Sequence, residues 1–295
     1  MIEMNRNFDV AIIGAGPAGT ACALALRNSG LNVALIDKSN FPRDKVCGDA
    51  IPGQALKLIR KLFDGEELEE LEAKHKIQSS KFYINNSKYI NIEWSLKAYN
   101  CKRSSFDDFM LNRVKNHTNV NVFEGIRIKE IKIGDRVEIA GIDSGFSISS
   151  DMIIGCDGAN SIVSKLCNNG TDKNSYGNAI RAYYKKVDSS EDSNDFFMID
   201  NIPGYFWIFP VGEHTFNVGL GLTANSSDRK LDIKKEFNNL IEHNQLIKKK
   251  FENALLVSGP KGHRLPMWRK KSKISGERYM LVGDAASTID PLFGH

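Results

Sequence analysis

The sequence predicts a mixed α/β (α+β) fold in which a nucleotide-binding domain is interrupted by an inserted antiparallel β-sheet domain. Three motifs of glycine and aspartate, each directly after a short apolar run, lie near the start, the middle and the end of the chain. Between the second and third motifs the sequence changes to aromatic-rich segments that are typical of antiparallel strands. Because the first and last motifs bracket this stretch, we expect a discontinuous nucleotide-binding domain over residues 1–75, 100–175 and 265–295, and a substrate domain over residues 76–99 and 176–264.

The first motif follows residues 8–13, an apolar run that predicts a buried parallel strand. Gly14 permits a tight turn, Gly16 lets the backbone approach a pyrophosphate, and Gly19 allows close packing of helix on sheet. A small-residue helix over 18–26 follows, and its N-terminus presents free N–H groups to phosphates. The candidate cofactor-binding residues of this Rossmann-like segment are Gly14, Ala15, Gly16, Pro17, Ala18, Gly19, Asp37 and Lys38.

A second strand, predicted over 32–36, ends in Asp37. This acid follows Gly14 at close to the ~20-residue spacing of a ribose-binding carboxylate. A carboxylate accepts a hydrogen bond from a free 2′-hydroxyl and disfavours a 2′-phosphate, so the segment predicts FAD or NAD and not NADP. The alternative for the glycine loop taken alone is a tight strand–helix turn that binds nothing.

Apolar periodicity and turn residues predict further elements along the rest of the chain. They are a helix over 54–63, a hairpin over 79–92 that turns at Asn85 and Asn86, a helix capped by Ser104 or Ser105 that runs through Phe109 and Val114, strands over 120–123, 127–133, 136–139, 146–148 and 152–154, a polar helix over 231–249, and a strand over 279–282. Residues 179–222 predict antiparallel strands rich in aromatic side chains.

Composition excludes little and is that of an ordinary globular protein. Of the 295 residues, 41% are hydrophobic and 26% charged, and the formal net charge is +4, which demands no nucleic-acid partner. We interpret the basic clusters at 248–250 and 269–271 as solvated surface, with attraction to an anionic membrane or a diphosphate as the alternative. The six histidines and five cysteines show no metal-binding spacing, so no metal site is expected.

The sequence shows no secretory signal and no apolar run long enough to cross a membrane. Its five cysteines therefore indicate reduced thiols and not a disulfide framework. We expect a cytoplasmic protein, with peripheral contact to a membrane left open.

The second motif contains Asp157 and Gly158, and the third contains Gly283 and Asp284. Each alone is typical of an ordinary turn or helix cap. Together with the glycine loop they resemble the flavoprotein superfamily typified by para-hydroxybenzoate hydroxylase. The resemblance implies FAD, with Asp157 and Gly158 near the pyrophosphate and Gly283 and Asp284 at the ribityl chain. It also implies a helix after Pro291 and Gly294 whose positive end faces the flavin pyrimidine ring.

Within that superfamily the sequence is most similar to the geranylgeranyl reductase family, through residues 41–48, 204–210, 217–221 and 276–284. The resemblance implies that Arg103, in Arg-x-x-Phe-Asp, contacts the cofactor phosphates, where a guanidinium is well suited. It also implies that Cys47 and Gly48 lie beside the isoalloxazine, and Cys47 is a candidate catalytic proton source. The family continues beyond the third motif, so a chain that stops at His295 is expected to lack the C-terminal part of the family fold.

The run from Tyr205 to Pro210 is the densest aromatic segment. On a strand, Tyr205, Trp207 and Phe209 share one face, either as core packing or as the wall of an apolar tunnel that binds an isoprenoid substrate. Halogenases of the superfamily also carry a tryptophan-rich motif ending in proline, but Phe206 and Phe209 depart from it.

The resemblance implies an FAD-dependent oxidoreductase that reduces carbon–carbon double bonds of a prenyl lipid by hydride transfer from reduced flavin. The sequence shows no second dinucleotide-binding unit, so NAD(P)H or a protein electron donor is expected to act transiently as the reductant. One alternative is a flavin monooxygenase that hydroxylates an aromatic or quinone precursor. Another is a flavin-free fragment that folds poorly or only binds lipid.

Overall fold

The computed structural model describes residues 7–66, 68–85, 89–142, 145–167, 176–223, 231–268 and 273–290. The chain divides into two compact units, each described by itself below. The first comprises Met1–Arg43, Asp107–Asp172 and Trp268–Ile289, and the second comprises Asp44–Phe106, Lys173–Met267 and Asp290–His295. Residues 44–75 and 100–106, expected with the nucleotide-binding part, are grouped with the second unit. The reason is that a short strand over Ala50–Ile51 pairs with residues 99 and 100 there.

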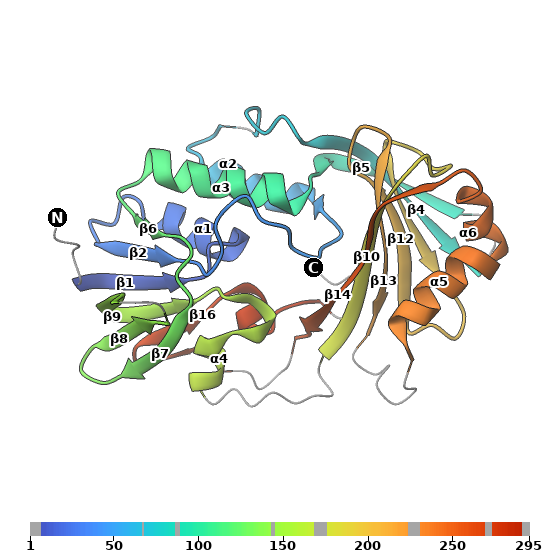
Figure 1. Cartoon of the computed structure of the whole chain (residues 1–295). Coiled ribbons are helices and arrows are strands. Elements are labelled where there is room, and N and C mark those ends of the chain that lie inside the picture. The colour runs from blue at the N-terminus through green and yellow to red at the C-terminus, as the bar shows by residue number, and fades with distance from the viewer. Residues whose placement is uncertain are drawn as a thin grey trace. The chain divides into compact units, whose positions relative to one another are not determined.

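The first unit is a Rossmann-like sheet (Figure 1) with the order β15-β16-β9-β1-β2-β6. From β16 to β6 all neighbours on this path are parallel, whereas β7 and β8 form an antiparallel extension of β9. The strands are β1 (Asn7–Ile13), β2 (Val33–Ile36), β6 (Asn121–Phe123), β7 (Ile128–Ile133), β8 (Val137–Gly141), β9 (Ser147–Gly155), β15 (Ser275–Gly276) and β16 (Tyr279–Leu281). The helices are α1 (Pro17–Ala25), α3 (Arg103–His117, whose first residues are grouped with the second unit), α4 (Ile162–Leu166) and two 3₁₀ turns, η1 (Gly158–Asn160) and η4 (Gly283–Ala286).

Two sequence predictions for this part of the chain were wrong. The strands expected over 146–148 and 152–154 are one continuous strand, β9, because both β1 and β8 pair along its length. Ser104 and Ser105 do not precede the helix but lie in the first turn of α3, which begins at Arg103. The strands and helix of the first motif are confirmed within one or two residues of the expected bounds.

The core of the first unit is built from small and β-branched side chains. Ala11, Ala34 and Ile153 are fully buried and lie in a cluster that includes Val137 of β8 and Val163 of α4. Burial on both faces explains why residues 10–13 of β1 and 33–36 of β2 are unbroken apolar runs in the sequence.

The second unit is a sheet with the order β14-β10-β13-β12-β11-β4-β5-β3. All neighbours are antiparallel except β11 and β4, which are parallel. The strands are β3 (Ala50–Ile51), β4 (His75–Ile84), β5 (Tyr89–Asn100), β10 (Tyr176–Lys185), β11 (Ser193–Met198), β12 (Gly204–Pro210), β13 (Thr215–Leu222) and β14 (Leu255–Pro266). The expected hairpin is confirmed as β4 and β5, but Asn86 of its expected turn lies outside the described residues.

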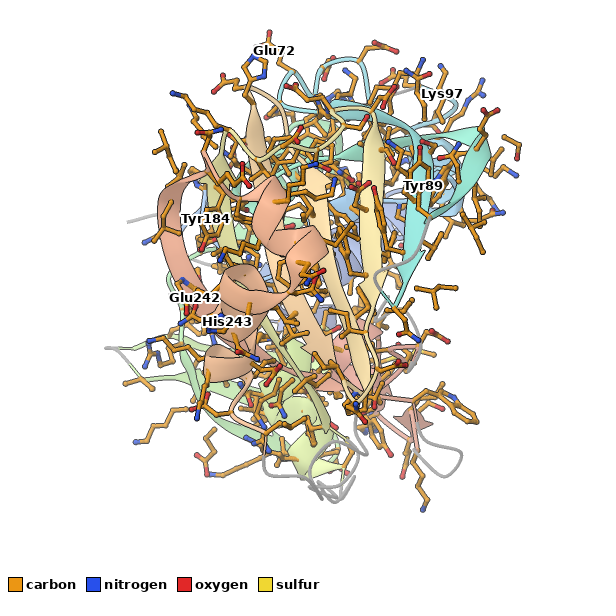
Figure 2. All side chains as sticks on the ribbon, turned by 90° about the vertical axis from the view of Figure 1, so that its right-hand side faces the viewer. Glu72, Tyr89, Lys97, Tyr184, Glu242 and His243 are labelled. Atoms are coloured by element: carbon orange, nitrogen blue, oxygen red, sulfur yellow. The ribbon has the colours of Figure 1, made fainter. Side chains whose placement is uncertain are left out.

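Helices α5 (Ile233–His243) and α6 (Gln245–Lys250) lie over one face of this sheet, in front of the strands in Figure 2. Phe237 and Leu240 of α5 and Ile247 of α6 are buried in the same cluster as Phe206 and Val218 of the sheet. The single helix expected over 231–249 was wrong, because the chain breaks at an extended Asn244 whose side chain caps α6. Helix α2 (Gly53–Leu62) packs against β5, where a Cβ on Gly53 would lie 2.5 Å from Leu96 Cβ.

Within the ranges that the structure describes, no helix is both long enough and apolar enough to span a membrane.

Candidate functional site

Four neighbouring parallel strands of the first unit end at one edge of the sheet, and each leads into a residue singled out from the sequence. The last residue of β1, Ile13, is in register with Ile36 of β2 and Gly155 of β9, and Gly155 is in register with Leu281 of β16. Nucleotides usually bind at the carboxyl end of a parallel sheet, where the connections that follow two neighbouring strands leave toward opposite faces of the sheet. The four strands lead into Gly14, Asp37, Asp157 and Asp284.

The three motifs pack against one another at this edge. Gly14 has φ +101°, and a Cβ there would lie 2.4 Å from the carbonyl oxygen of Cys156 in the second motif. A Cβ on Gly19 would lie 1.8 Å from the carbonyl oxygen of Gly14, and one on Gly283 of the third motif would lie 3.2 Å from Ala18 Cβ. Only glycine fits the first two positions, so motifs far apart in the sequence form one cradle.

Asp37 braces the glycine loop from the end of β2. Its Oδ2 accepts a hydrogen bond of 2.8 Å from the backbone N–H of Ala15, and its Oδ1 accepts one of 2.8 Å from Ser39. Each carboxylate oxygen keeps a second lone pair, so the group has capacity for a ribose hydroxyl. Lys38, the next residue, is exposed.

Asp157 is half-buried, and its carboxyl group is only half satisfied. Its Oδ2 accepts a hydrogen bond of 2.7 Å from Ile162 N, but its Oδ1 has no hydrogen-bond partner among the described residues. Burial away from water raises the pKa of this carboxyl. A buried acceptor of this kind costs stability unless a donor reaches it, which is an expected feature of a ligand site.

Helix α1 begins directly after the loop. Its N-cap residue is Gly16, which offers no side chain, and no side-chain hydrogen bond caps the helix. Its first N–H groups therefore remain for an anion. The glycine cradle and the uncapped helix together fit the pyrophosphate half of FAD, which accepts hydrogen bonds from backbone N–H groups.

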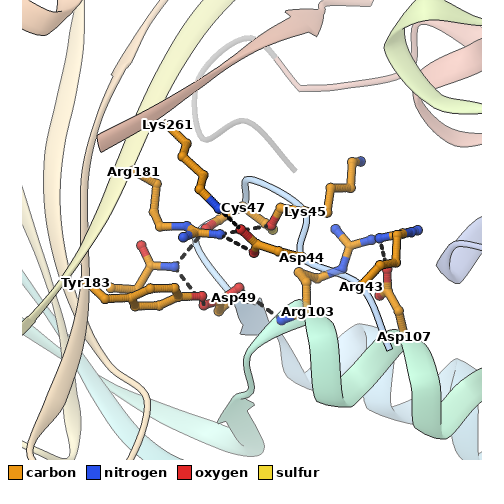
Figure 3. A network of polar contacts seen from close by, with 11 residues as sticks. Arg43, Asp44, Lys45, Cys47, Asp49, Arg103, Asp107, Arg181, Tyr183 and Lys261 are labelled. Carbon is orange, nitrogen blue, oxygen red and sulfur yellow. Dashed lines mark hydrogen bonds and ion pairs between the residues drawn. The ribbon is translucent and has the colours of Figure 1, made fainter. Parts of the chain in front are cut away.

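The second unit contains a buried polar network centred on Asp49, whose side chain is at the middle of Figure 3. Asp49 is 1% exposed and has φ +66°. Its Oδ2 accepts hydrogen bonds from Tyr183 Oη at 2.6 Å and Asn217 Nδ2 at 2.8 Å, and its Oδ1 accepts one from Arg103 N at 3.3 Å. Burial raises the pKa of Asp49, against the opposing effect of the hydrogen bonds from Tyr183 and Asn217.

Asn217 links this network to the loop that carries Cys47. Its Nδ2 donates to the Cys47 carbonyl oxygen at 2.7 Å, and its Oδ1 accepts from Trp207 Nε1 at 2.9 Å. A Cβ on Gly48 would lie 3.3 Å from the Phe209 ring and 3.9 Å from Trp207 Nε1. The structure therefore brings together Cys47, Gly48, Trp207 and Phe209, which the sequence singled out separately.

A second anchor of the same loop is Arg181 on β10, which is fully buried (Figure 3). Its Nη2 donates to Asp44 Oδ1 at 2.7 Å and to the Lys45 carbonyl oxygen at 3.2 Å, and the guanidinium lies 4.2 Å from the centre of the Tyr183 ring. Burial acts to raise the pKa of Asp44, but hydrogen bonds from Lys261 and Arg181 hold it below its usual value.

The sequence model of the family described as FAD binding domain matches residues 7–295. The chain belongs to this FAD-binding family. The family, the mixed α/β fold and the FAD cofactor expected from the sequence are thereby confirmed.

Relatives and solved structures of known name are similar to this FAD-binding protein over almost its whole length. A menaquinone reductase of Mycolicibacterium smegmatis is 28% identical over 308 residues, which cover 99% of this chain and 73% of the relative. Digeranylgeranylglycerophospholipid reductase 2 of Methanopyrus kandleri is 29% identical over 295 residues, which cover 97% of this chain and 72% of the relative. The crystal structure of a geranylgeranyl bacteriochlorophyll reductase-like protein from Thermoplasma acidophilum matches with a TM-score of 0.85 at 22% identity, covering 98% of this chain and 74% of that protein, and this shows the shared fold.

The remaining candidate residues of this FAD-binding protein stay predictions. Arg103 is the first residue of α3, and its backbone N–H donates a hydrogen bond to Asp49. The contact of its guanidinium with cofactor phosphates remains an expectation from the resemblance. Pro291, Gly294 and the basic cluster at 269–271 lie outside the described residues. In the part of the chain that the structure describes, no group of three or more His, Cys, Asp and Glu residues is placed to hold a metal ion.

Sequence reasoning missed Asp49, Tyr183, Arg181 and Asn217. Each was an isolated polar residue in a loop or strand, and nothing in periodicity marks a polar residue as buried. A signal was present for two of them: Asp49 directly follows Cys47 and Gly48, and Asn217 opens the Asn-Val-Gly-Leu-Gly stretch.

Proposed function

We propose that this FAD-dependent oxidoreductase reduces carbon–carbon double bonds of a prenyl chain, with Cys47 as the proton donor. The observation that carries the proposal is the contact of the Cys47–Gly48 loop with Trp207 and Phe209, which puts a thiol-bearing loop against an apolar aromatic wall. Relatives named menaquinone reductase and digeranylgeranylglycerophospholipid reductase support it, because both names denote reductases of prenyl-bearing molecules.

The residues of the second unit supply the environment that such a reaction needs. Trp207 and Phe209 are each 5% exposed, and they exclude water from the surface beside the loop. An isolated alkene is a poor hydride acceptor, so a dry site and a placed proton source are both required. Asn217 fixes the Cys47 carbonyl and so sets the position from which the thiol acts.

Bound FAD, once reduced, supplies a hydride. In the overall reaction the π bond breaks and two C–H bonds form, one with that hydride and one with a proton that leaves the Cys47 thiol and is replaced from solvent. NAD(P)H or a protein electron donor of the cell restores the reduced cofactor. The chain's own part is to bind the cofactor through the glycine cradle, hold the alkene against the aromatic wall and place the proton.

The experiment is an anaerobic incubation of the FAD-loaded protein with dithionite and geranylgeraniol, followed by mass spectrometry. In D₂O we expect a reduced product that gains two deuterium atoms at carbon for each double bond reduced, because the hydride of a dithionite-reduced flavin and the thiol proton both derive from solvent. Cys47→Ala is expected to lower kcat by about a hundredfold or more, the scale of a lost general acid, with KM little changed. Lys57→Ala, at an exposed position on α2, is the control.

A product that forms only with oxygen and gains a hydroxyl group would overturn the proposal in favour of the monooxygenase alternative. A protein that shows no flavin absorption bands at saturating FAD would contradict any flavin chemistry by this chain. Full turnover by Cys47→Ala would remove the thiol from the mechanism but leave the reduction in place.

A further inference from the structure

One face of the second sheet carries an unbroken apolar row that runs outward from the site. Trp207 of β12 is in register with Phe196 of β11, Phe196 with Phe82 of β4, and Phe82 with Ile90 of β5. Partners in register point to the same face, so the row crosses four strands. We call it the apolar track, which consists of Tyr205, Trp207, Phe209, Phe196, Phe82, Ile90, Ile92 and Trp94.

The rings of the track touch one another. Phe82 stacks on Phe196 with a centroid distance of 4.8 Å, and Phe196 lies 4.9 Å from Phe209 and 5.5 Å from Tyr205. Trp94 Nε1 donates to Ser80 Oγ at 3.0 Å, so its polar atom is satisfied and its ring is left as apolar surface. The track therefore offers a continuous hydrocarbon surface from the Gly48 loop to β5.

The opposite face of the same strands carries a second aromatic row, which is part of the hydrophobic core. There Phe206 lies 5.9 Å from Phe197, and Phe197 stacks on Tyr83 at 4.5 Å. Helix α5 covers this second row, with Phe237 at 5.8 Å from Phe206, on the face seen in Figure 2. That side of the sheet thus has its own core, whereas Trp207 and Phe209 of the track form a smaller buried cluster with Ala179. Ile90, Ile92 and Trp94 at the other end of the track belong to neither cluster.

Exposure rises along the track. Trp207 and Phe209 are buried, Phe196 and Phe82 are half-buried, and Ile90 and Ile92 on β5 are 56% and 51% exposed. Among the strands that the structure describes, residues 89–94 of β5 pair with β4 alone, so the track ends at a strand edge. An exposed apolar surface that is continuous with a buried site is typical of a ligand groove, and it is otherwise an aggregation hazard.

We propose that the apolar track binds the distal part of a prenyl chain, and that Ile90, Ile92 and Trp94 select for long chains. This inference rests on the proposed function, because it assigns the far end of the same substrate. Three inter-strand steps separate β12 from β5, about 14 Å in all. A short prenyl chain bound at Trp207 does not reach β5, whereas a long chain does. The track itself carries no charged side chain that a bound prenyl chain would cover and leave unpaired.

The experiment compares geraniol, farnesol and geranylgeraniol as binding probes of the FAD-loaded protein by calorimetry. Replacing both isoleucines (Ile90→Gln with Ile92→Gln) is expected to raise the Kd of geranylgeraniol about tenfold, the scale of two lost aliphatic contacts. The Kd of geraniol is expected to stay within about twofold of the wild-type value. Leu256→Gln is the control, because Leu256 on β14 of the same sheet is also 56% exposed but lies off the track.

Trp94 gives a second readout. Geranylgeraniol is expected to shift tryptophan emission to the blue in the wild-type protein, and the shift is expected to shrink in Trp94→Phe, whereas the smaller response to geraniol stays the same in both. Trp207 is present in both proteins and reports the proximal end of the chain.

The track is refuted if the isoleucine variant weakens all three alcohols equally, if it leaves geranylgeraniol unchanged, or if the wild-type protein binds none of them. If the isoleucine variant loses binding to phosphatidylglycerol vesicles but binds the alcohols as the wild-type protein does, the surface is a membrane contact instead. Binding that depends on chain length, without any reduction of the chain, would support the track as a binding surface and contradict the proposed function. If the isoleucine variant reduces geranylgeraniol and binds it with unchanged affinity, the proposed function is supported and the role of the track is contradicted.

Discussion

Asn217 and Trp207 are joined by a buried hydrogen bond of 2.9 Å, and the same amide holds the Cys47 carbonyl oxygen at 2.7 Å. One side chain, with no exposed surface, therefore sets the relative position of the aromatic wall and the thiol loop. Because its third bond is to Asp49, its removal leaves several polar atoms buried without partners.

We therefore expect Asn217→Leu to lower the free energy of unfolding by about 3 kcal/mol, the sum of a few unsatisfied buried groups. Urea unfolding followed by circular dichroism measures this change. Asn91→Leu, at an exposed position on β5, is the matched control and is expected to change stability by less than about 0.5 kcal/mol. A loss in Asn217→Leu no larger than in the control would contradict the network.

The glycine cradle gives a prediction about FAD affinity. Gly19→Ala is expected to abolish measurable FAD binding, because the added Cβ would lie 1.8 Å from the Gly14 carbonyl oxygen and must displace the loop. Gly30→Ala is the control: its φ is +76°, but nothing lies within 4 Å of the added Cβ. The control is expected to cost about 1 kcal/mol of stability and to keep FAD affinity. Titration with FAD, followed by quenching of flavin fluorescence, measures both variants, and equal affinities would exclude the cradle.

The fold was largely predictable, because its signals are local. The apolar run of β1, the glycine loop and the acid after β2 each follow from the chemistry of a few adjacent residues, and the structure places them together. The break at Asn244 was missed because apolar spacing continues on both sides of it; the capping side chain of Asn244, which was the available signal, was not used.

The candidate site was less predictable, because its polar network joins residues far apart in sequence. Asp49 and Tyr183 are 134 positions apart, and Arg181 and Asp44 are 137 apart. Which isolated polar residue becomes buried depends on the strand order of the sheet. That order includes a parallel pairing of β11 with β4 that a run of antiparallel-looking strands does not reveal.

Arg181 gives a prediction about stability. Its Nε and Nη1 are buried and have no hydrogen-bond partner in the described part of the chain, which offsets the gain from its ion pair with the part-exposed Asp44. We expect Arg181→Met to change the free energy of unfolding by less than about 1 kcal/mol, since a buried ion pair replaced by an apolar side chain of similar volume is often neutral. Lys261→Met, which removes the other, exposed partner of Asp44, is the comparison. Urea unfolding of both variants checks this, and a loss of about 3 kcal/mol or more in Arg181→Met alone would show that the pair is strongly stabilising.

Asp49 gives a prediction about pH. Burial raises its pKa in the folded state, so above the unfolded value of about 3.9 the folded protein binds more protons than the unfolded chain. Under those conditions the free energy of unfolding falls as pH rises, and the fall continues until pH passes the folded-state pKa. Asp49→Asn cannot ionise and lacks this contribution, whereas Asp157 and every other titrating group remain in both proteins.

The wild-type protein is therefore expected to lose stability relative to Asp49→Asn as pH is raised from about 4 towards neutrality. The test is the slope of the difference between the two unfolding free energies, measured in urea across that range. A constant offset between them reports only the altered hydrogen bonds to Tyr183 and Asn217. Parallel curves, or a wild-type protein that gains stability relative to the variant as pH rises, would mean that the three hydrogen bonds to Asp49 outweigh its burial, and that the carboxylate is held ionised in the folded state.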